Sequence, residues 1–325
     1  MFSIRTDLAV EAREIYQKDK TGEVPGVEVN VDEDQEGIKV TTVKVVDSVG
    51  ARILNKAIGT YITMEVPDIK SYDADYHDNL SKSLAKQLVK VVELKENQTA
   101  LVVGLGNWNI TPDSLGPKVV SKLMVTRHMK QYIPDQIEEG IYSVCAISPG
   151  VLGITGIETA EIVQGICQKV KPDVLVVIDA LASRKMERVV TTIQIGDTGI
   201  SPGSGVGNHR MQFTKESMGV PVIAIGVPTV VDAATMANDT IDMMIDSLIE
   251  QSKDNKDFYN MLKGVNKDEK YSMIRDVLNP YIGDLMVTPK EIDTLMEDMS
   301  KIIANGLNIA LHPAIELKDV NRYVH

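Results

Sequence analysis

The sequence has few aromatic residues and little positive charge. Aromatic side chains make up only 4% of the 325 residues, and the formal net charge is −12. Proteins that bind nucleic acids directly rely on a basic surface and on aromatic platforms for the bases. We therefore expect no direct binding to nucleic acid, whereas an acidic surface leaves protein partners open.

The sequence also lacks long apolar runs and paired cysteines. Its longest apolar runs, residues 174–178 and 220–231, end or meet a proline well before the roughly 20 residues that cross a bilayer. The first 20 residues mix acids and bases and have no signal-peptide core. Cys145 and Cys167 lie in apolar stretches without C-x-x-C spacing, which is typical of reduced, buried thiols. Together these features predict a cytoplasmic protein without a membrane segment.

Apolar runs alternate with amphipathic stretches along the chain, and this pattern predicts an α/β fold with a mostly parallel sheet flanked by helices. We expect one domain, residues 8–325, in which the first two strands form a small additional sheet near the N-terminus. The methionines of the helix at 232–251, among them Met243 and Met244, are interpreted as core filler. The predicted strands are 37–46, 60–64, 100–103, 142–147, 173–178, 189–194 and 220–225, and the predicted helices include 80–94, 112–129 and 232–251.

The stretch LVVGLGNWNITPDSLGP, residues 101–117, begins like a dinucleotide-binding loop. Gly104 and Gly106 match the first two glycines of G-x-G-x-x-G, but Asn109 stands in place of the third. Asp113 then occupies the position where a phosphate would lie, and its carboxylate would repel a dinucleotide. A nucleotide-binding oxidoreductase therefore remains only an alternative hypothesis.

Two aspartates follow predicted strands and are candidate catalytic residues. Asp113 comes one loop after the strand at 100–103, and Asp179 ends the apolar run VLVVI. If these strands are neighbours, both carboxyl groups overlook one cleft at the carboxyl edge of the sheet, where they can share one proton and activate water. The simpler alternative for Asp113 is that it complements the dipole of a helix capped by Thr111 and begun by Pro112.

The loop ISPGSGVGNHR, residues 200–210, offers backbone N–H groups suited to an oxyanion hole or a substrate cleft. Its candidate residues are Gly203, Ser204, Gly205 and His209, although His209 is equally typical of a structural histidine. Arg184, after Asp179, is either a surface charge or a group that orients a substrate carboxylate. The five histidines show no metal-ligand spacing, so no metal is expected, although Asp113, Asp179 and a distant histidine would suffice to build a site.

Four blocks of sequence closely resemble the germination protease family of endospore-forming bacteria, in its clostridial form. The blocks are IRTDLAVEA, VVGLGNWNITPDSLGPKVV, VIDALASR and DTGISPGSGVGNHR. The resemblance implies a homotetrameric aspartic endopeptidase of the forespore and spore core that needs no cofactor and cuts small acid-soluble spore proteins during germination. It places the family's two catalytic aspartates at Asp113 and Asp179. The fold is similar to that of the hydrogenase maturation peptidases, whose corresponding acids bind a metal, and a metal-dependent peptidase is therefore an alternative.

The resemblance also implies a zymogen that removes residues 1–7 by cutting between Asp7 and Leu8. The surrounding residues, RTD-LAVEA, are similar to the family's substrate pattern of glutamate, a bulky apolar residue, alanine, any residue and glutamate. Here aspartate replaces the first glutamate, and slower cleavage of the zymogen than of spore proteins is expected. Two simpler alternatives are a frayed terminus at residues 1–7 and a regulatory protein that binds spore proteins without cutting them.

Overall fold

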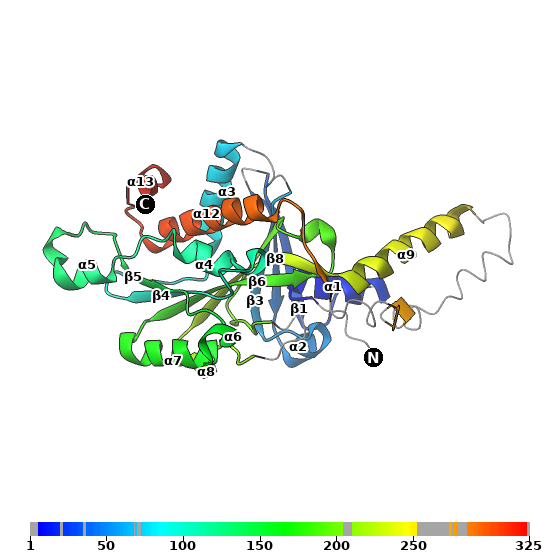
Figure 1. The fold of residues 1–325 in the computed structure, drawn as a ribbon, viewed down its shortest axis with the longest axis horizontal. Helices are drawn as coiled ribbons and strands as arrows, with labels where there is room; N and C mark the ends of the chain where they lie inside the picture. The colour runs from blue at the N-terminus through cyan, green and yellow to red at the C-terminus, as the bar shows by residue number, and fades with distance from the viewer. Residues whose placement is uncertain are drawn as a thin grey trace.

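One sheet forms the centre of the protein in the computed structural model, which describes residues 6–19, 22–34, 37–67, 69, 73–203, 210–251, 273–274, 276–277 and 285–323. Its strand order is β1-β2-β3-β7-β8-β6-β4-β5, with β9 paired to β8 (Figure 1). The strands are β1 Val27–Glu33, β2 Lys39–Val45, β3 Gly59–Glu65, β4 Thr99–Gly104, β5 Ser143–Ile147, β6 Val174–Ser183, β7 Thr192–Gly196, β8 Val222–Asp232 and β9 Met286–Val287.

The strand directions confirm the α/β prediction and refine it. Strands β5, β4, β6 and β8 run parallel to one another, whereas β1, β2, β3 and β7 are antiparallel to their neighbours. The strands predicted as a small additional sheet are present near the N-terminus. They do not form a separate sheet, because β3 pairs with β7 and so joins them to the main sheet.

Helices cover both faces of the sheet. In Figure 1, α3, α4 and α12 lie on one side of β4 and β6, and α6, α7 and α8 lie on the other. No helix of the described residues is both long and apolar enough for a membrane span. The helices are α1 Ala9–Asp19, α2 Ser48–Leu54, α3 Ala74–Val89, α4 Leu115–Val120, α5 Arg127–Tyr132, α6 Leu152–Thr155, α7 Thr159–Val170, α8 Lys215–Met218, α9 Ala233–Gln251, α12 Ile292–Leu311 and α13 Leu317–Tyr323, and the short 3₁₀ turns are η1 Thr111–Asp113, η2 Pro134–Gln136 and η3 Met186–Arg188.

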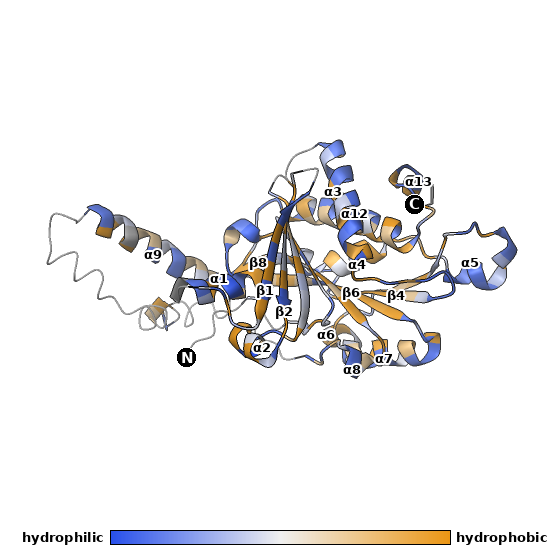
Figure 2. Cartoon of the chain, turned by 180° about the vertical axis from the view of Figure 1, so that it is seen from behind, coloured by the Kyte–Doolittle hydropathy of each residue, from blue (hydrophilic) through white to orange (hydrophobic). Residues whose placement is uncertain are grey.

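Strand β6 is buried on both faces, and this explains its unbroken apolar sequence. Val176 and Ile178 point into the core beneath α3, α4 and α12, whereas Leu175 and Val177 point into the core against α7. Figure 2 shows the same strand as a hydrophobic band between helices with polar outer faces. Because side chains alternate along a strand, Asp179 lies on the same face as Leu175 and Val177.

The predicted helix at 112–129 is wrong, because this segment forms three short elements. The turn η1 ends at Asp113, α4 occupies Leu115–Val120, and α5 begins at Arg127. Gly116 lies so close to strand β4 that a Cβ there would stand 2.3 Å from the Leu105 carbonyl oxygen. This close approach fixes where α4 lies and sets Asp113 in a separate turn ahead of it.

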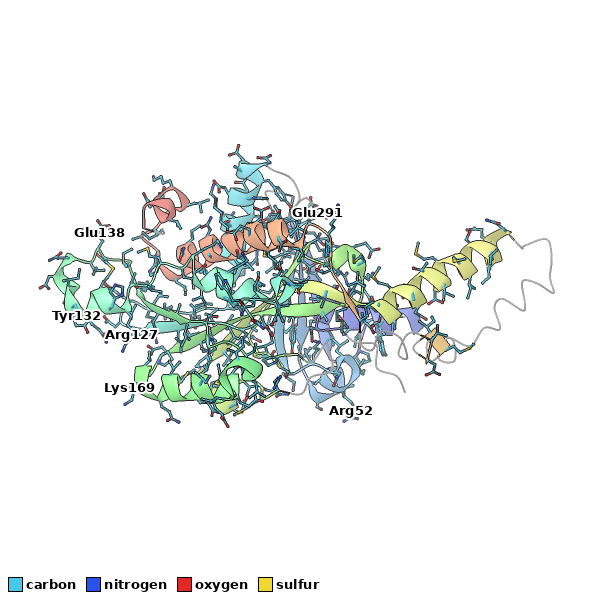
Figure 3. The ribbon with its side chains drawn as sticks, viewed as in Figure 1. Arg52, Arg127, Tyr132, Glu138, Lys169 and Glu291 are labelled. Atoms are coloured by element: carbon cyan, nitrogen blue, oxygen red, sulfur yellow. The ribbon has the colours of Figure 1, made fainter. Side chains whose placement is uncertain are left out.

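The predicted helix at 232–251 is present as α9, which projects from one end of the molecule (Figure 1). The interpretation of its methionines as core filler is wrong for Met243 and Met244, which are 73% and 60% exposed. Among the described residues of α9, Met236 near its start is partly buried against the core, as the interpretation predicts. Figure 3 shows the outer side chains of α9 standing away from the body, so this helix presents apolar groups to its surroundings.

Candidate active site

Asp113 and Asp179 come together at the edge where strand β4 ends beside β6; the predicted strand end at Asp179 is wrong, because β6 continues past Asp179 to Ser183. Gly104 ends β4 opposite Ile178 on β6, and the Leu105 N–H donates to the Ile178 carbonyl oxygen at 2.8 Å. Asp179 follows Ile178 directly, and η1 returns Asp113 to the same edge of the sheet. Open α/β sheets bind ligands at this edge.

The Asp113 carboxylate is held by backbone rather than by a helix terminus. Its Oδ2 accepts a hydrogen bond from the Asn107 N–H at 2.8 Å, and its own N–H donates to the Ile110 carbonyl at 2.8 Å. Thr111 is the first residue of the turn, and no side chain caps η1. The carboxylate therefore closes the loop between β4 and η1, which fixes its position at the strand edge.

The glycines of the 101–117 stretch make room for this loop, which explains a pattern that resembles a nucleotide site. Gly106 has φ +112°, and a Cβ there would lie 2.0 Å from the Asp113 carbonyl oxygen and 3.1 Å from Asp113 Oδ1. A Cβ on Gly104 would lie 2.2 Å from the Gly116 carbonyl oxygen. The space beside these glycines is filled by the aspartate turn and by α4.

Gly106→Ala is expected to destabilise the fold by about 2–4 kcal/mol, because alanine there meets both a backbone clash and an unfavourable φ. Urea unfolding monitored by circular dichroism measures this loss. Gly153→Ala is the matched control, since a Cβ at this helical position meets nothing within 4 Å. It is expected to leave stability unchanged or to raise it by up to about 1 kcal/mol. Equal stability of the two variants would contradict the tight packing of the Asp113 loop.

The two carboxyl groups have different environments. Asp179 is 5% exposed, and burial raises its pKa well above the ordinary 3.8; the charges of Asp113 and Asp7 raise it further, against an opposing hydrogen bond from the Ala180 N–H. Burial also raises the pKa of Asp113, opposed by the Asn107 N–H. Asp113 therefore ionises first, and its charge keeps the proton on Asp179.

Asp179 belongs to a row of paired residues that crosses the sheet. Asp179 on β6 is opposite Gly226 on β8, which is opposite Gln194 on β7. Neighbouring strands are about 4.8 Å apart, so the Cα atoms of Asp179 and Gln194 lie roughly 10 Å apart with their side chains on the same face. Gly226 has no side chain between them, and the Leu181 side chain covers it.

The N-terminal segment lies over this row, so that Asp7 and Leu8 come next to Asp179. The Asp7 N–H donates to the Ala182 carbonyl at 3.1 Å, and Asp7 Oδ2 accepts from the Ala182 N–H at 3.0 Å. Leu8 is fully buried and packs against Leu181. The proximity of the Asp7 carboxylate is also visible in its effect on the pKa of Asp179.

The next residues of the segment are held by the same surface. The Ala9 N–H donates to Gln194 Oε1 at 2.7 Å. Glu11 is 1% exposed, and its carboxylate accepts from the backbone N–H groups of Arg184 at 2.7 Å and Lys185 at 3.0 Å. Arg188 Nη1 lies 3.4 Å from the same carboxylate. The segment from Asp7 to Glu11, whose last three residues begin helix α1, is therefore held against the sheet by contacts at Asp7, Leu8, Ala9 and Glu11.

The other residues predicted to line the substrate cleft are Arg184 and the glycine-rich loop. The Arg184 guanidinium pairs with Asp239 of α9 at 2.9 Å, and its backbone N–H is the group that reaches Glu11. Gly203 lies in a turn with φ +72°. Ser204, Gly205 and His209 lie outside the described residues, and their predicted role in the cleft stays a prediction.

Several polar groups lie away from this site. His312 is buried and accepts at Nδ1 from the Tyr142 N–H, so its Nε2–H donates to the Met124 carbonyl, and burial lowers its pKa to about 4. This histidine is structural. Cys145 and Cys167 are free thiols, as predicted; Cys167 is buried, whereas the prediction of burial is wrong for Cys145, which is only partly buried. Within the part of the chain that the structure describes, no cluster of three or more His, Cys, Asp or Glu side chains is placed to hold a metal.

Sequence reasoning missed three residues that contact the N-terminal segment: Lys56, Gln194 and Arg188. Each lies far along the chain from the segment, and none belongs to a motif.

Lys185 and Arg188 also line an open cleft beside α9, together with Glu65, Asp239 and Met243. The Glu11 end of the segment therefore lies beside this cleft.

Comparison with known proteins gives matches over the whole chain. A family model described as Germination protease matches in two overlapping stretches, residues 6–263 and 245–324. A protein named Germination protease from Clostridium tetani is 62% identical over 99% of this chain and 100% of its own length. Those from Clostridium acetobutylicum and Bacillus licheniformis are 58% and 42% identical over 100% of this chain, and over 100% and 97% of their own lengths.

Among solved structures, the [NiFe] hydrogenase maturation protease HycI from Thermococcus kodakarensis KOD1 matches with a TM-score of 0.30 and 20% identity. The match covers 44% of this chain and 80% of the other. This similarity is too low to carry a function or a site from one protein to the other.

Proposed function

The chain belongs to the germination protease family, and from this premise we propose that it cuts small acid-soluble spore proteins with Asp113 and Asp179 as an aspartic pair. Membership itself makes the chain a protease of spore germination. The proposal adds the substrate, the catalytic type, the location in the forespore and spore core, and activation by self-cleavage.

The proposed mechanism uses one ionised and one protonated carboxyl group. Asp113, which ionises first, accepts a proton from a water molecule as the water oxygen attacks the carbonyl carbon of the scissile peptide. The resulting tetrahedral intermediate collapses with cleavage of the C–N bond. The Asp179 carboxyl group gives its proton to the leaving nitrogen, so that the products are a carboxylic acid and an amine.

The observation that carries this proposal is the position of the chain's own segment from Asp7 to Glu11 beside Asp179. Asp7 and Leu8 lie beside Asp179, with Leu8 buried against Leu181 and Glu11 bound by backbone N–H groups. A segment held in this way is the substrate of an intramolecular reaction. We propose that residues 1–7 are a propeptide, that cleavage falls between Asp7 and Leu8, and that residues 8–325 form the single domain of the mature enzyme.

The rate of self-cleavage is expected to depend on pH in a bell shape. The active form carries one proton on the pair, so the rate rises as pH falls through the raised pKa of Asp179. The rate falls again once Asp113 is also protonated. Intact-mass spectrometry of the purified chain over a pH series, quantifying the loss of residues 1–7, measures the profile. A rate that stays constant from about pH 4 to 8 would argue against a shared proton.

The same incubation separates the aspartic mechanism from the metal-dependent alternative. An aspartic pair needs no metal, so cleavage is expected to continue at an unchanged rate after treatment with a chelator. Loss of cleavage with EDTA and its return with added zinc would favour the alternative.

We also propose that the enzyme is a homotetramer. Exposed apolar side chains on the projecting helix α9, namely Met243, Met244 and Leu248, support an assembly surface at that end of the molecule. Light scattering after size exclusion is expected to give a mass near four chains, and a monomer mass would exclude the assembly.

A further inference from the structure

The carbonyl oxygen of Asp7 accepts two side-chain hydrogen bonds. Lys56 Nζ donates at 2.7 Å, and Gln194 Nε2 donates at 3.2 Å. The two donors are 49 and 187 residues away along the chain and come from the loop after α2 and from strand β7. A charged donor and an amide donor thus converge on one backbone carbonyl, which is the carbonyl of the bond proposed to be cut.

Donors at this oxygen matter more during the reaction than before it. Attack of water on the carbonyl carbon moves negative charge onto the oxygen, and donors already in place stabilise that charge without reorganising. Removing one such donor from a hydrolase typically lowers kcat by about 10²–10³-fold. The aspartate pair does not supply this function, because its carboxyl groups transfer protons at the water and at the leaving nitrogen.

We propose that Lys56 and Gln194 are catalytic residues that form the oxyanion site of this enzyme. The proposal rests on the proposed function, since it takes the Asp7–Leu8 peptide as a substrate in place. During the attack of water, Lys56 and Gln194 donate to the developing alkoxide and give up no proton. When the C–N bond breaks, the carbonyl re-forms between the same two donors.

Gln194 also fixes the direction of the peptide. Its Oε1 accepts from the Ala9 N–H while its Nε2 donates to the Asp7 carbonyl, so one amide holds the chain on both sides of Leu8. Gln194 lies in the same row of the sheet as Asp179, separated from it by Gly226. The Gln194 amide therefore aligns the Asp7–Leu8 peptide on the face of the sheet that carries Asp179.

Lys56 reaches the carbonyl because of how α2 ends. Asn55 caps this helix in the left-handed conformation, with φ 51°, and the Lys56 N–H donates back to the Ala51 carbonyl at 3.1 Å. Burial lowers the pKa of Lys56, and the carboxylates of Asp7 and Glu11 raise it. When the amine is protonated, the oxyanion site includes a full positive charge.

Substitutions by side chains of similar size separate a catalytic role from a role in anchoring the segment from Asp7 to Glu11. Lys56→Met removes the charge and the donor, and Lys56→Arg keeps both. Gln194→Glu keeps the acceptor for the Ala9 N–H but removes the donor to the Asp7 carbonyl. Lys44→Met, at an exposed position on β2, is the control. Each variant is assayed for self-cleavage by intact mass, for kcat and KM on a purified small acid-soluble spore protein, and for Tm.

Lys56→Met and Gln194→Glu are expected to lower the self-cleavage rate and kcat by about 10²–10³-fold, with KM within a few fold of wild type. Lys56→Arg is expected to recover part of the loss, and Lys44→Met to match wild type. If the wild type cuts its substrate and Lys56→Met and Gln194→Glu both keep the wild-type kcat, the oxyanion site is overturned while the proposed function stands. A rise in KM at constant kcat would assign the two side chains to anchoring and also overturn the oxyanion site. No cleavage by the wild type in either assay would overturn the proposed function, and this inference with it.

Discussion

Asp113→Asn and Asp179→Asn are each expected to stop the removal of residues 1–7. Asparagine matches the shape of aspartate but neither accepts a proton from water nor gives one to the leaving nitrogen. General acid–base catalysis contributes about 10²–10⁴-fold per group, so the rate is expected to fall by roughly 10³-fold or more. Intact mass after incubation in mild acid, compared with wild type in parallel, measures the effect.

Asp173→Asn is the matched control for these variants. Asp173 directly precedes strand β6, at the end of this strand that lies away from Asp113. Its Oδ2 accepts a hydrogen bond from the Thr99 N–H at 2.8 Å. Asparagine keeps that acceptor, so the control is expected to cleave at the wild-type rate. Cleavage that persists in both Asp113→Asn and Asp179→Asn would place the chemistry on other residues.

The Asp179 variant is also expected to be more stable than wild type at neutral pH. The folded-state pKa of Asp179 lies well above the ordinary 3.8, so the folded chain holds this proton more tightly than the unfolded chain does. Stability of the wild type therefore falls as pH rises from about 3.8 through that raised pKa. Asparagine keeps the hydrogen bond from the Ala180 N–H without the buried charge.

Thermal unfolding over a pH series checks this expectation. The Tm of Asp179→Asn is expected to exceed that of wild type above the raised pKa and to approach it in acid. An inactive but more stable variant is typical of active-site charges, which are kept for function at the expense of stability. A variant less stable than wild type at every pH would contradict the burial of an ionisable Asp179.

Glu11→Gln is expected to slow self-cleavage by about 10–100-fold. The Glu11 carboxylate accepts from two backbone N–H groups at 2.7 and 3.0 Å and lies near Arg188. Hydrogen bonds to a buried charge contribute about 1.5–3 kcal/mol, and the amide presents an NH₂ group to one of these N–H donors. The segment is then held less firmly across Asp179. Time courses of intact mass give the rate.

Glu14→Gln is the matched control one turn further along α1. Glu14 pairs with the side chains of Lys185 at 2.8 Å and Arg188 at 2.5 Å, and it is more exposed than Glu11. Ion pairs between partly exposed side chains contribute little, so a change within about threefold is expected. Equal rates for the two variants, at equal Tm, would mean that the Glu11 contact does not position the scissile bond.

The sequence by itself determined the fold class and indicated Asp113 and Asp179 as candidates, whereas their proximity depended on β4 and β6 being neighbours in the sheet. The apolar run at 174–178 had to be a strand buried on both faces, but its pattern did not indicate that the strand continues past Asp179 to Ser183. Asp113 was indicated by its position one loop after the predicted strand at 100–103. The resemblance to the germination protease family implied the similarity of residues 7–11 to a substrate, and this similarity stays a prediction.

The tertiary structure alone decided what surrounds the peptide between Asp7 and Leu8. Local periodicity cannot tell that β7 and β6 flank β8, and this order is what puts Gln194 in one row with Asp179. Lys56 reaches the Asp7 carbonyl from 49 residues away. The segment predicted as a helix at 112–129 forms three short elements, and one of them, α4, packs Gly116 against the end of β4, a contact invisible to helix propensity. Short-range patterns fix which elements form, whereas the pairing of distant strands fixes which side chains meet.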